Sequence, residues 1–204
     1  MSIFKTLSEK SWATPRSVSE INPRDISEGL AAKTGLKFFI GVLSSMFFLF
    51  CVGYKMRMEL SDWVPLQDPN LLWFNTAILV LSSIAMQLAK NAAMAGKIKK
   101  VRLYLTAAGG LTIGFLIGQI TVWQELLDAG LYQLSSAPLA FFILLTGLHG
   151  LHLTGGLFVW ARSVYKAWLG MEIERFKLTI ELCTTYWHYL MLVWFVFFAL
   201  LLAT

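Results

Sequence analysis

The chain has 204 residues, of which 57% are hydrophobic and 14% are charged. Soluble domains usually carry about 25% charged residues, so this composition excludes an ordinary water-soluble domain and indicates a membrane protein. The net charge of +5 is spread over short connections without forming a basic domain, and we expect no nucleic-acid partner.

Residues 1–32 form a polar segment with no apolar stretch ending in a small-residue cleavage site, so a cleavable signal peptide is not expected. Five apolar stretches follow, each close to the roughly 20 residues that a helix needs to cross the hydrocarbon layer. They are predicted at Gly35–Tyr54, Leu71–Ala89, Leu103–Gln124, Pro138–Ala161 and Leu182–Ala203. The predicted fold is all-α, with a five-helix transmembrane bundle over residues 33–204.

The positive charges mark one side of the membrane. Lysine and arginine gather before the first span, between the second and third spans, and between the fourth and fifth. The last two groups are Lys90, Lys97, Lys99, Lys100 and Arg102, and Arg162, Lys166, Arg175 and Lys177. The positive-inside rule therefore predicts a cytoplasmic N-terminus and a C-terminus on the outside. The same charges favour contact with anionic lipid head groups.

Small residues recur along two of the predicted spans. Because lipid gives apolar helices no hydrophobic reason to associate, close packing depends on such residues and on hydrogen bonds between helices. The third span repeats them every four residues, and the fourth ends its repeat with a glycine pair. We expect helix packing at Gly110, Gly114, Gly118, Gly150, Gly155 and Gly156.

Two of the three histidines lie in 146-TGLHGLHLTGG-156, and the third lies in the fifth span. His149 and His152 are about 60° apart around a helix, and His188 would approach them if the two helices are neighbours. Such a group suits a zinc or copper site, a haem clamp or a proton relay. However, no carboxylate lies within helical reach of the pair to orient the rings. Bonding to neighbouring helices or lipid is the favoured interpretation, and the other three remain open.

One stretch in each span resembles a known family. The fourth, 147-GLHGLHLTGG-156, is similar to a His-Gly-x-His-Val-x-x-Gly motif, and the fifth, 186-YWHYLMLVWFVFF-198, to Trp-His-Phe-x-Asp-x-x-Trp. The stretches 114-GFLIGQITVW-123, 76-TAILVLSSIAMQLAKNA-92 and 43-LSSMFFLF-50 complete the series. In this order they resemble subunit III of the haem–copper respiratory oxidases, in its five-helix form.

The resemblance implies a non-catalytic subunit of a bacterial terminal oxidase in the inner membrane. Haem and copper would belong to partner subunits, with no metal or catalytic residue in this chain. The expected partners are the catalytic subunit I, possibly subunit II, and membrane phospholipids, and the expected role is to sustain turnover. By the resemblance, the interhelical polar contacts and lipid-site supports are His149, His152, Trp187, His188 and Gln119.

The sequence departs from this family at three membrane carboxylates. Ser45 and Val122 stand where the family pattern has glutamate, and Met191 stands where it has aspartate. Buried carboxylates are the groups best suited to collect or move protons, so we hypothesise a subunit III without a proton-antenna role. The departures also favour an alternative, a subunit-III-like protein of a nitric oxide reductase. A small membrane haem or metal protein is a third interpretation.

Overall fold

The computed structural model describes residues 23–61, 63, 70–128, 137–170 and 176–203. All regular secondary structure in these ranges is helical. The helices are α2 (Pro23–Met58), α3 (Asn70–Met94), α4 (Ile98–Asp128), α5 (Ala137–Trp168) and α6 (Lys177–Leu202). Contacts divide the chain into residues 1–35, which include the start of α2, and residues 36–204, which include the rest of α2 and helices α3 to α6.

Within the described residues, five helices are long and apolar enough to cross a membrane. The prediction of an all-α, multi-pass membrane protein is therefore confirmed. Most helices extend beyond the predicted spans, because a helix keeps its backbone groups bonded internally as it passes from lipid into the polar interface. Since α2 begins at Pro23, residues 23–32 of the predicted N-terminal segment are helical. Residues 1–22 of that segment lie outside the described residues.

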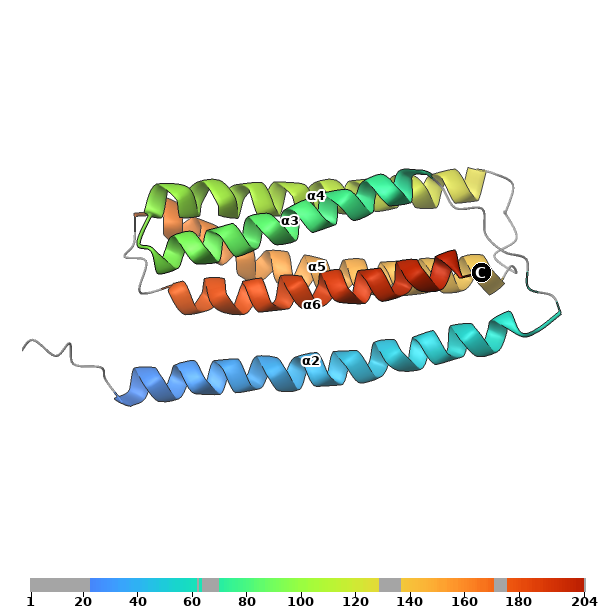
Figure 1. Ribbon diagram of the computed structural model, residues 1–204, viewed down its shortest axis with the longest axis horizontal. Helices are drawn as coiled ribbons and strands as arrows, with labels where there is room; N and C mark the ends of the chain where they lie inside the picture. Colours follow the sequence, from blue (N-terminus) through green and yellow to red (C-terminus); the bar gives the residue numbers. More distant parts are fainter. Residues whose placement is uncertain (1–22, 62, 64–69, 129–136, 171–175, 204) are drawn as a thin grey trace, which may run out of the picture. The chain divides into compact units, whose positions relative to one another are not determined.

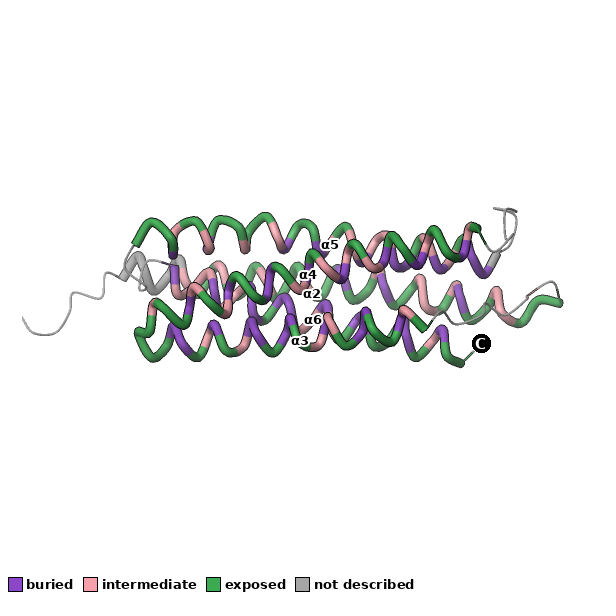
Figure 2. Tube along the Cα trace, turned by 90° about the horizontal axis from the view of Figure 1, so that it is seen from above, coloured by how far each residue is buried: buried purple, intermediate pink, exposed green. Residues whose placement is uncertain are grey.

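Helices α3 to α6 form a closed ring in which each contacts the next, and α3 also contacts α6 (Figure 1). Neighbouring helices run antiparallel: Ser82 on α3 meets Thr112 on α4, while Asn75, earlier on α3, packs against Gly118, later on α4. Buried positions alternate with exposed ones along each helix (Figure 2). This pattern is that of an up-and-down bundle with its core inside the ring.

A tight turn joins α3 to α4. Gly96 adopts a φ of +68°, which side chains other than glycine rarely tolerate. Its neighbour Lys97 donates a 2.9 Å hydrogen bond to the Ala92 carbonyl, and Gly96 itself bonds the Ala93 carbonyl at 3.2 Å. This pair of bonds satisfies carbonyls at the end of α3 and lets α4 return beside it.

Arginine ties the start of α4 to the end of α5. Arg102 Nε donates a 2.8 Å hydrogen bond to the Ala167 carbonyl, and its guanidinium lies 5.6 Å from the Trp168 ring centroid. The last carbonyls of a helix lack their regular partners within it, and the Ala167 carbonyl accepts from the Gly170 N–H at 3.3 Å as well as from Arg102.

Residues 36–58 of α2 contact the ring through a few side chains. Phe47 packs against Phe197, with ring centroids 5.3 Å apart, and Tyr54 packs against Phe141 at 5.9 Å. Ser44 Oγ lies 3.1 Å from the Tyr189 hydroxyl. Most of the remaining α2 side chains are exposed, so α2 offers a broad apolar surface to lipid or to another protein.

Candidate functional site

A buried hydrogen-bonded cluster joins α3, α4 and α6. Trp187 Nε1 on α6 donates to Ser82 Oγ at 3.2 Å and to Thr112 Oγ1 at 3.1 Å. The two hydroxyls lie 2.7 Å apart, and each lies within 2.9 Å of the Ala108 carbonyl. All three side chains are almost completely buried. The predicted site residue Trp187 is therefore the centre of a three-helix junction.

His188, the next residue on α6, faces α3. Its Nδ1 lies 2.6 Å from Ser83 Oγ and its Nε2 lies 3.0 Å from Gln87 Oε1. Gln87 Nε2 donates in turn to Asn91 Oδ1 at 3.1 Å. A neutral imidazole carries one N–H donor and one acceptor nitrogen, so its two nitrogens can bond both side chains at once. The imidazole thus links α3 and α6.

The other two histidines have different surroundings. His152 is half-buried, its Nδ1 donates to the Leu148 carbonyl at 2.7 Å, and its ring lies 5.4 Å from that of Phe47 on α2. His149 is completely buried among aromatic rings of α4 and α6, with Phe115 at 6.1 Å and Trp194 at 5.4 Å. A rotation of about 60° around α5 is therefore enough to give the two histidines different neighbours.

Four side chains have a buried polar atom without a hydrogen-bond partner among the described residues: Trp63, through its Nε1, and Asn75, Gln119 and His149. Both polar atoms of each of the last three are unpartnered. Their exposed fractions are 1%, 3% and 0%. Sequence reasoning selected Gln119 and His149 but missed Asn75. The available signal was an amide inside an apolar span, where such groups commonly hold helices together.

The glycines that were predicted to pack fall into two groups, according to whether a Cβ added to them would meet another helix. A Cβ on Gly118 would overlap Asn75, and one on Gly156 would lie 3.1 Å from Tyr186 and Trp187. One on Gly150 would touch Leu116 at 3.5 Å. By contrast, a Cβ built on Gly110, Gly114 or Gly155 would have no described residue within 4 Å beyond its chain neighbours and the nearby backbone of its own helix.

The expected packing stripe on α4 is therefore not continuous within this chain. Positions four apart advance about 40° around a helix, so Gly114 and Gly110 are rotated by about 40° and 80° from Gly118, and neither has a neighbour at its Cβ position. Close contact with α5 instead occurs at Gly109, where a Cβ would overlap the Trp160 ring. Trp160 Nε1 also donates to the Leu105 carbonyl at 2.9 Å.

A groove of about 770 Å³ lies among α2, α5 and α6. Its lining is mostly apolar and includes Phe39, Phe158 and Leu182, together with His152 and the pair Gly155 and Gly156. The Tyr186 hydroxyl donates to the His152 carbonyl at 3.3 Å beside it. The missing side chain of Gly155 leaves open space at the groove, whereas Gly156 lets α5 pack closely against Tyr186 and Trp187.

The three positions that lack the family's carboxylates have distinct environments. Ser45 is exposed and its hydroxyl donates to the Gly41 carbonyl of its own helix at 3.1 Å. Val122 is completely buried in the bundle, and Met191 is half-buried. A glutamate at position 122 would enter an apolar core and require a partner there.

Within the ranges that the structure describes, no group of three or more His, Cys, Asp or Glu side chains could hold a metal ion. The three histidines do not form such a group, because His149 lies in the ring's core, His152 beside α2 and His188 against α3. The fold and these contacts define a helical membrane protein whose buried polar groups mainly connect helices.

Comparison with known proteins gives the family. The sequence model of the family "Cytochrome c oxidase subunit III" matches residues 26–203 of this chain. The chain therefore belongs to this family. The chain is 26% identical to a probable cytochrome c oxidase subunit 3 of Mycobacterium leprae over 92% of each chain. It is 29% identical to the Mycobacterium tuberculosis protein of that name over 62% of each chain. It is 27% identical to quinol oxidase subunit 3 of Bacillus subtilis over 64% of each.

Proposed function

We propose that this chain is the non-catalytic subunit III of a bacterial haem–copper terminal oxidase in aerobic electron transport. In this role it packs on the catalytic subunit I, with subunit II as a second candidate partner, binds phospholipid and sustains turnover. Haem and copper belong to those partner subunits. The observation that carries the proposal is the family match over residues 26–203, which spans all five apolar helices. The use of Trp187 and His188 as links between helices supports a structural role.

Two of the predicted packing glycines suit a partner subunit. Gly110 and Gly114 lie on a face of α4 where Ile113 and Ile117 are exposed by 46% and 60%. A smooth face of this kind lets another transmembrane helix approach closely. We place the contact with the catalytic subunit on this face.

Affinity purification in mild detergent tests the partner. The tagged chain is expected to recover haem–copper oxidase subunits, identified by mass spectrometry, together with a Soret band that the singly expressed chain lacks. Gly114→Leu should reduce recovery of these subunits, because leucine would hold the partner helix away. Gly41→Leu is the control, since a Cβ at Gly41 also meets nothing within 4 Å but lies on α2. Recovery of a nitric oxide reductase would assign the alternative function, and a Soret band from the single chain would contradict both.

The orientation follows from charge. Lys97, Lys99 and Lys100 are exposed at the turn between α3 and α4. With the positive side inside, this turn and the N-terminus are cytoplasmic and the C-terminus is outside. The membrane is the bacterial inner membrane, in keeping with the mycobacterial and Bacillus relatives.

The lipid site is proposed in the groove among α2, α5 and α6. Its apolar lining suits an acyl chain, and its volume of about 770 Å³ falls in the usual range for a ligand site. Two exposed cations follow lining residues in sequence: Lys37 follows Leu36, and Arg162 lies three residues after Val159. Because basic side chains near the cytoplasmic surface attract anionic head groups, the preferred ligand is an anionic phospholipid.

Filling the groove tests the site. Gly155→Leu adds a side chain where nothing lies within 4 Å and is expected to lower the phospholipid retained after detergent purification, measured by native mass spectrometry. The variant should also lower the number of turnovers that the oxidase completes before it is inactivated. Gly41→Leu is the matched control because Gly41 does not line the groove and lies about 200° around α2 from the lining residue Phe39. Equal lipid retention by the two variants would contradict the site.

A further inference from the structure

We propose that Asn75, Gln119 and His149 form a buried water-binding site inside the bundle, in which bound water joins α3, α4 and α5. The three side chains come from three helices and are nearly or completely buried. None has a hydrogen-bond partner among the described residues. This site goes beyond the proposed oxidase role and does not depend on it.

Contacts place the three side chains in one cross-section of the ring. Asn75 packs against Gly118, the residue before Gln119. Phe115, one turn earlier on α4, lies 6.1 Å from the His149 ring. Trp194 closes the cross-section from α6, because its ring lies 5.4 Å from His149 and its Nε1 donates to Thr76 Oγ1 at 3.0 Å.

The energetics require partners for these groups. A buried polar atom without a hydrogen bond costs about 1–3 kcal/mol, and six such atoms are involved here. That total is comparable to the whole stability of a typical domain, about 5–15 kcal/mol. In native proteins such groups are usually satisfied by ordered water when protein partners are missing.

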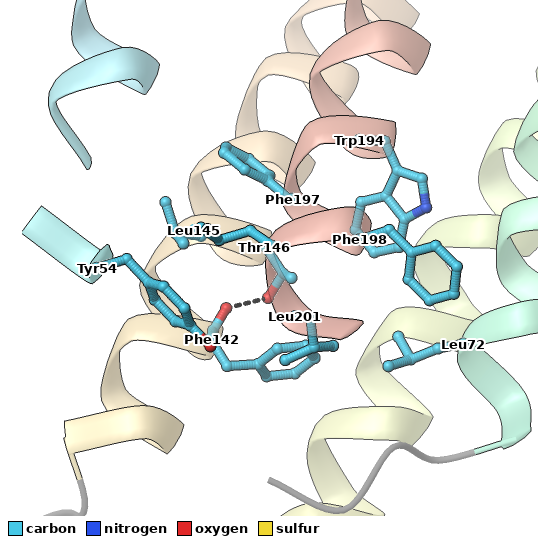
Figure 3. Close-up of a pocket in the computed structure, with 10 residues that line it drawn as sticks. Tyr54, Leu72, Phe142, Leu145, Thr146, Trp194, Phe197, Phe198 and Leu201 are labelled. Carbon is cyan, nitrogen blue, oxygen red and sulfur yellow. Dashed lines mark hydrogen bonds between the residues drawn. The ribbon is translucent and has the colours of Figure 1, made fainter. Parts of the chain in front are cut away.

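Figure 3 shows a small cavity inside the bundle, which shares Trp194 with the cross-section but is lined by none of Asn75, Gln119 and His149. It has a volume of about 20 Å³, above the roughly 10–15 Å³ that one water molecule needs. Its lining includes Trp194 and Phe197, two of the rings around His149. Thr146, one turn before His149, adds a hydroxyl to the lining, already within 2.6 Å of the Phe142 carbonyl.

The hydrogen-bonding groups of these three side chains favour water as the ligand. Each amide supplies both a donor and an acceptor, and a neutral imidazole supplies one of each. An ion of either sign would need a counter-charge that amides and imidazole do not carry. A small neutral molecule that both donates and accepts matches the set. Leu72 and Leu201 also line the cavity, so it lies toward the end of the bundle where α6 finishes.

X-ray radiolytic footprinting of the chain in its purified native complex tests the site, because bound water yields hydroxyl radicals that modify adjacent rings. Phe115 and Phe176 are matched controls, with exposed fractions of 1% and 0%, but only Phe115 borders the proposed water. We expect Phe115 to be modified several-fold faster than Phe176. Equal rates, whether fast or slow, would overturn the proposal in favour of a dry cross-section.

A variant tests which groups hold the water. Gln119→Leu combined with His149→Phe removes four of the six polar atoms and should bring Phe115 modification down to the rate of Phe176. Unchanged fast modification of Phe115 would also overturn the proposal, since the water would then not depend on these side chains. If the double variant does not assemble, the comparison of Phe115 with Phe176 in the wild-type complex decides the question alone.

Discussion

Gly109→Ala is expected to lower the free energy of unfolding by about 2–4 kcal/mol, through overpacking and loss of one hydrogen bond. The new methyl group would overlap the Trp160 ring on α5. Moving that rigid ring away would also break its 2.9 Å bond to the Leu105 carbonyl. The measurement is unfolding of the purified chain in mixed micelles, followed by circular dichroism.

The neighbouring glycine supplies the control for this prediction. A Cβ on Gly110 meets no atom within 4 Å, and alanine is a better helix former than glycine by about 1 kcal/mol. Gly110→Ala should therefore leave the stability unchanged or raise it slightly. If the two variants lower the free energy of unfolding equally, the prediction that Gly109 is in close contact with α5 is wrong.

Trp187→Leu is expected to destabilise the protein by about 3–5 kcal/mol, the cost of truncating a buried tryptophan. The ring is 1% exposed, and its N–H binds both hydroxyls of the junction between α3, α4 and α6. Trp187→Phe should cost less, because it keeps one ring in place and loses chiefly the N–H. The same unfolding assay checks both variants.

Trp168→Leu is the comparison for the tryptophan at the junction. Trp168 is 61% exposed, and its ring lies 5.6 Å from the guanidinium of Arg102, an interaction worth about 0.5–1 kcal/mol at an exposed site. A loss of stability at Trp168 as large as that at Trp187 would show that the junction is not the source of the effect.

The polar residues of α3 show how far sequence reasoning reached. The serine pair in TAILVLSSIAMQLAKNA contributed to the family resemblance, but nothing in the sequence assigned Ser82 to Trp187 and Ser83 to His188. These partners lie 105 residues away, and their pairing depends on the antiparallel register of α3 and α6. Asn75 was missed for the same reason, since its burial against Gly118 depends on how closely α4 approaches.

The histidines also show that the sequence does not reveal which helices face each other. A spacing of three residues predicted that His149 and His152 share a side of their helix, and this spacing also suggested a common site with His188. In the folded chain the three rings contact Trp194, Phe47 and Ser83 respectively. Periodicity describes one helix at a time and carries no information on which helix lies opposite.

The sequence by itself determined the number of spans, the all-helical class and the family. Hydrocarbon thickness sets the length of every span, and unpaired backbone groups are too costly in lipid for any open alternative to the helix. Only the tertiary structure decided which glycines pack inside the chain, which helix each histidine faces and where the buried amides meet. Those features depend on the rotation and register of whole helices, which many small contacts set together.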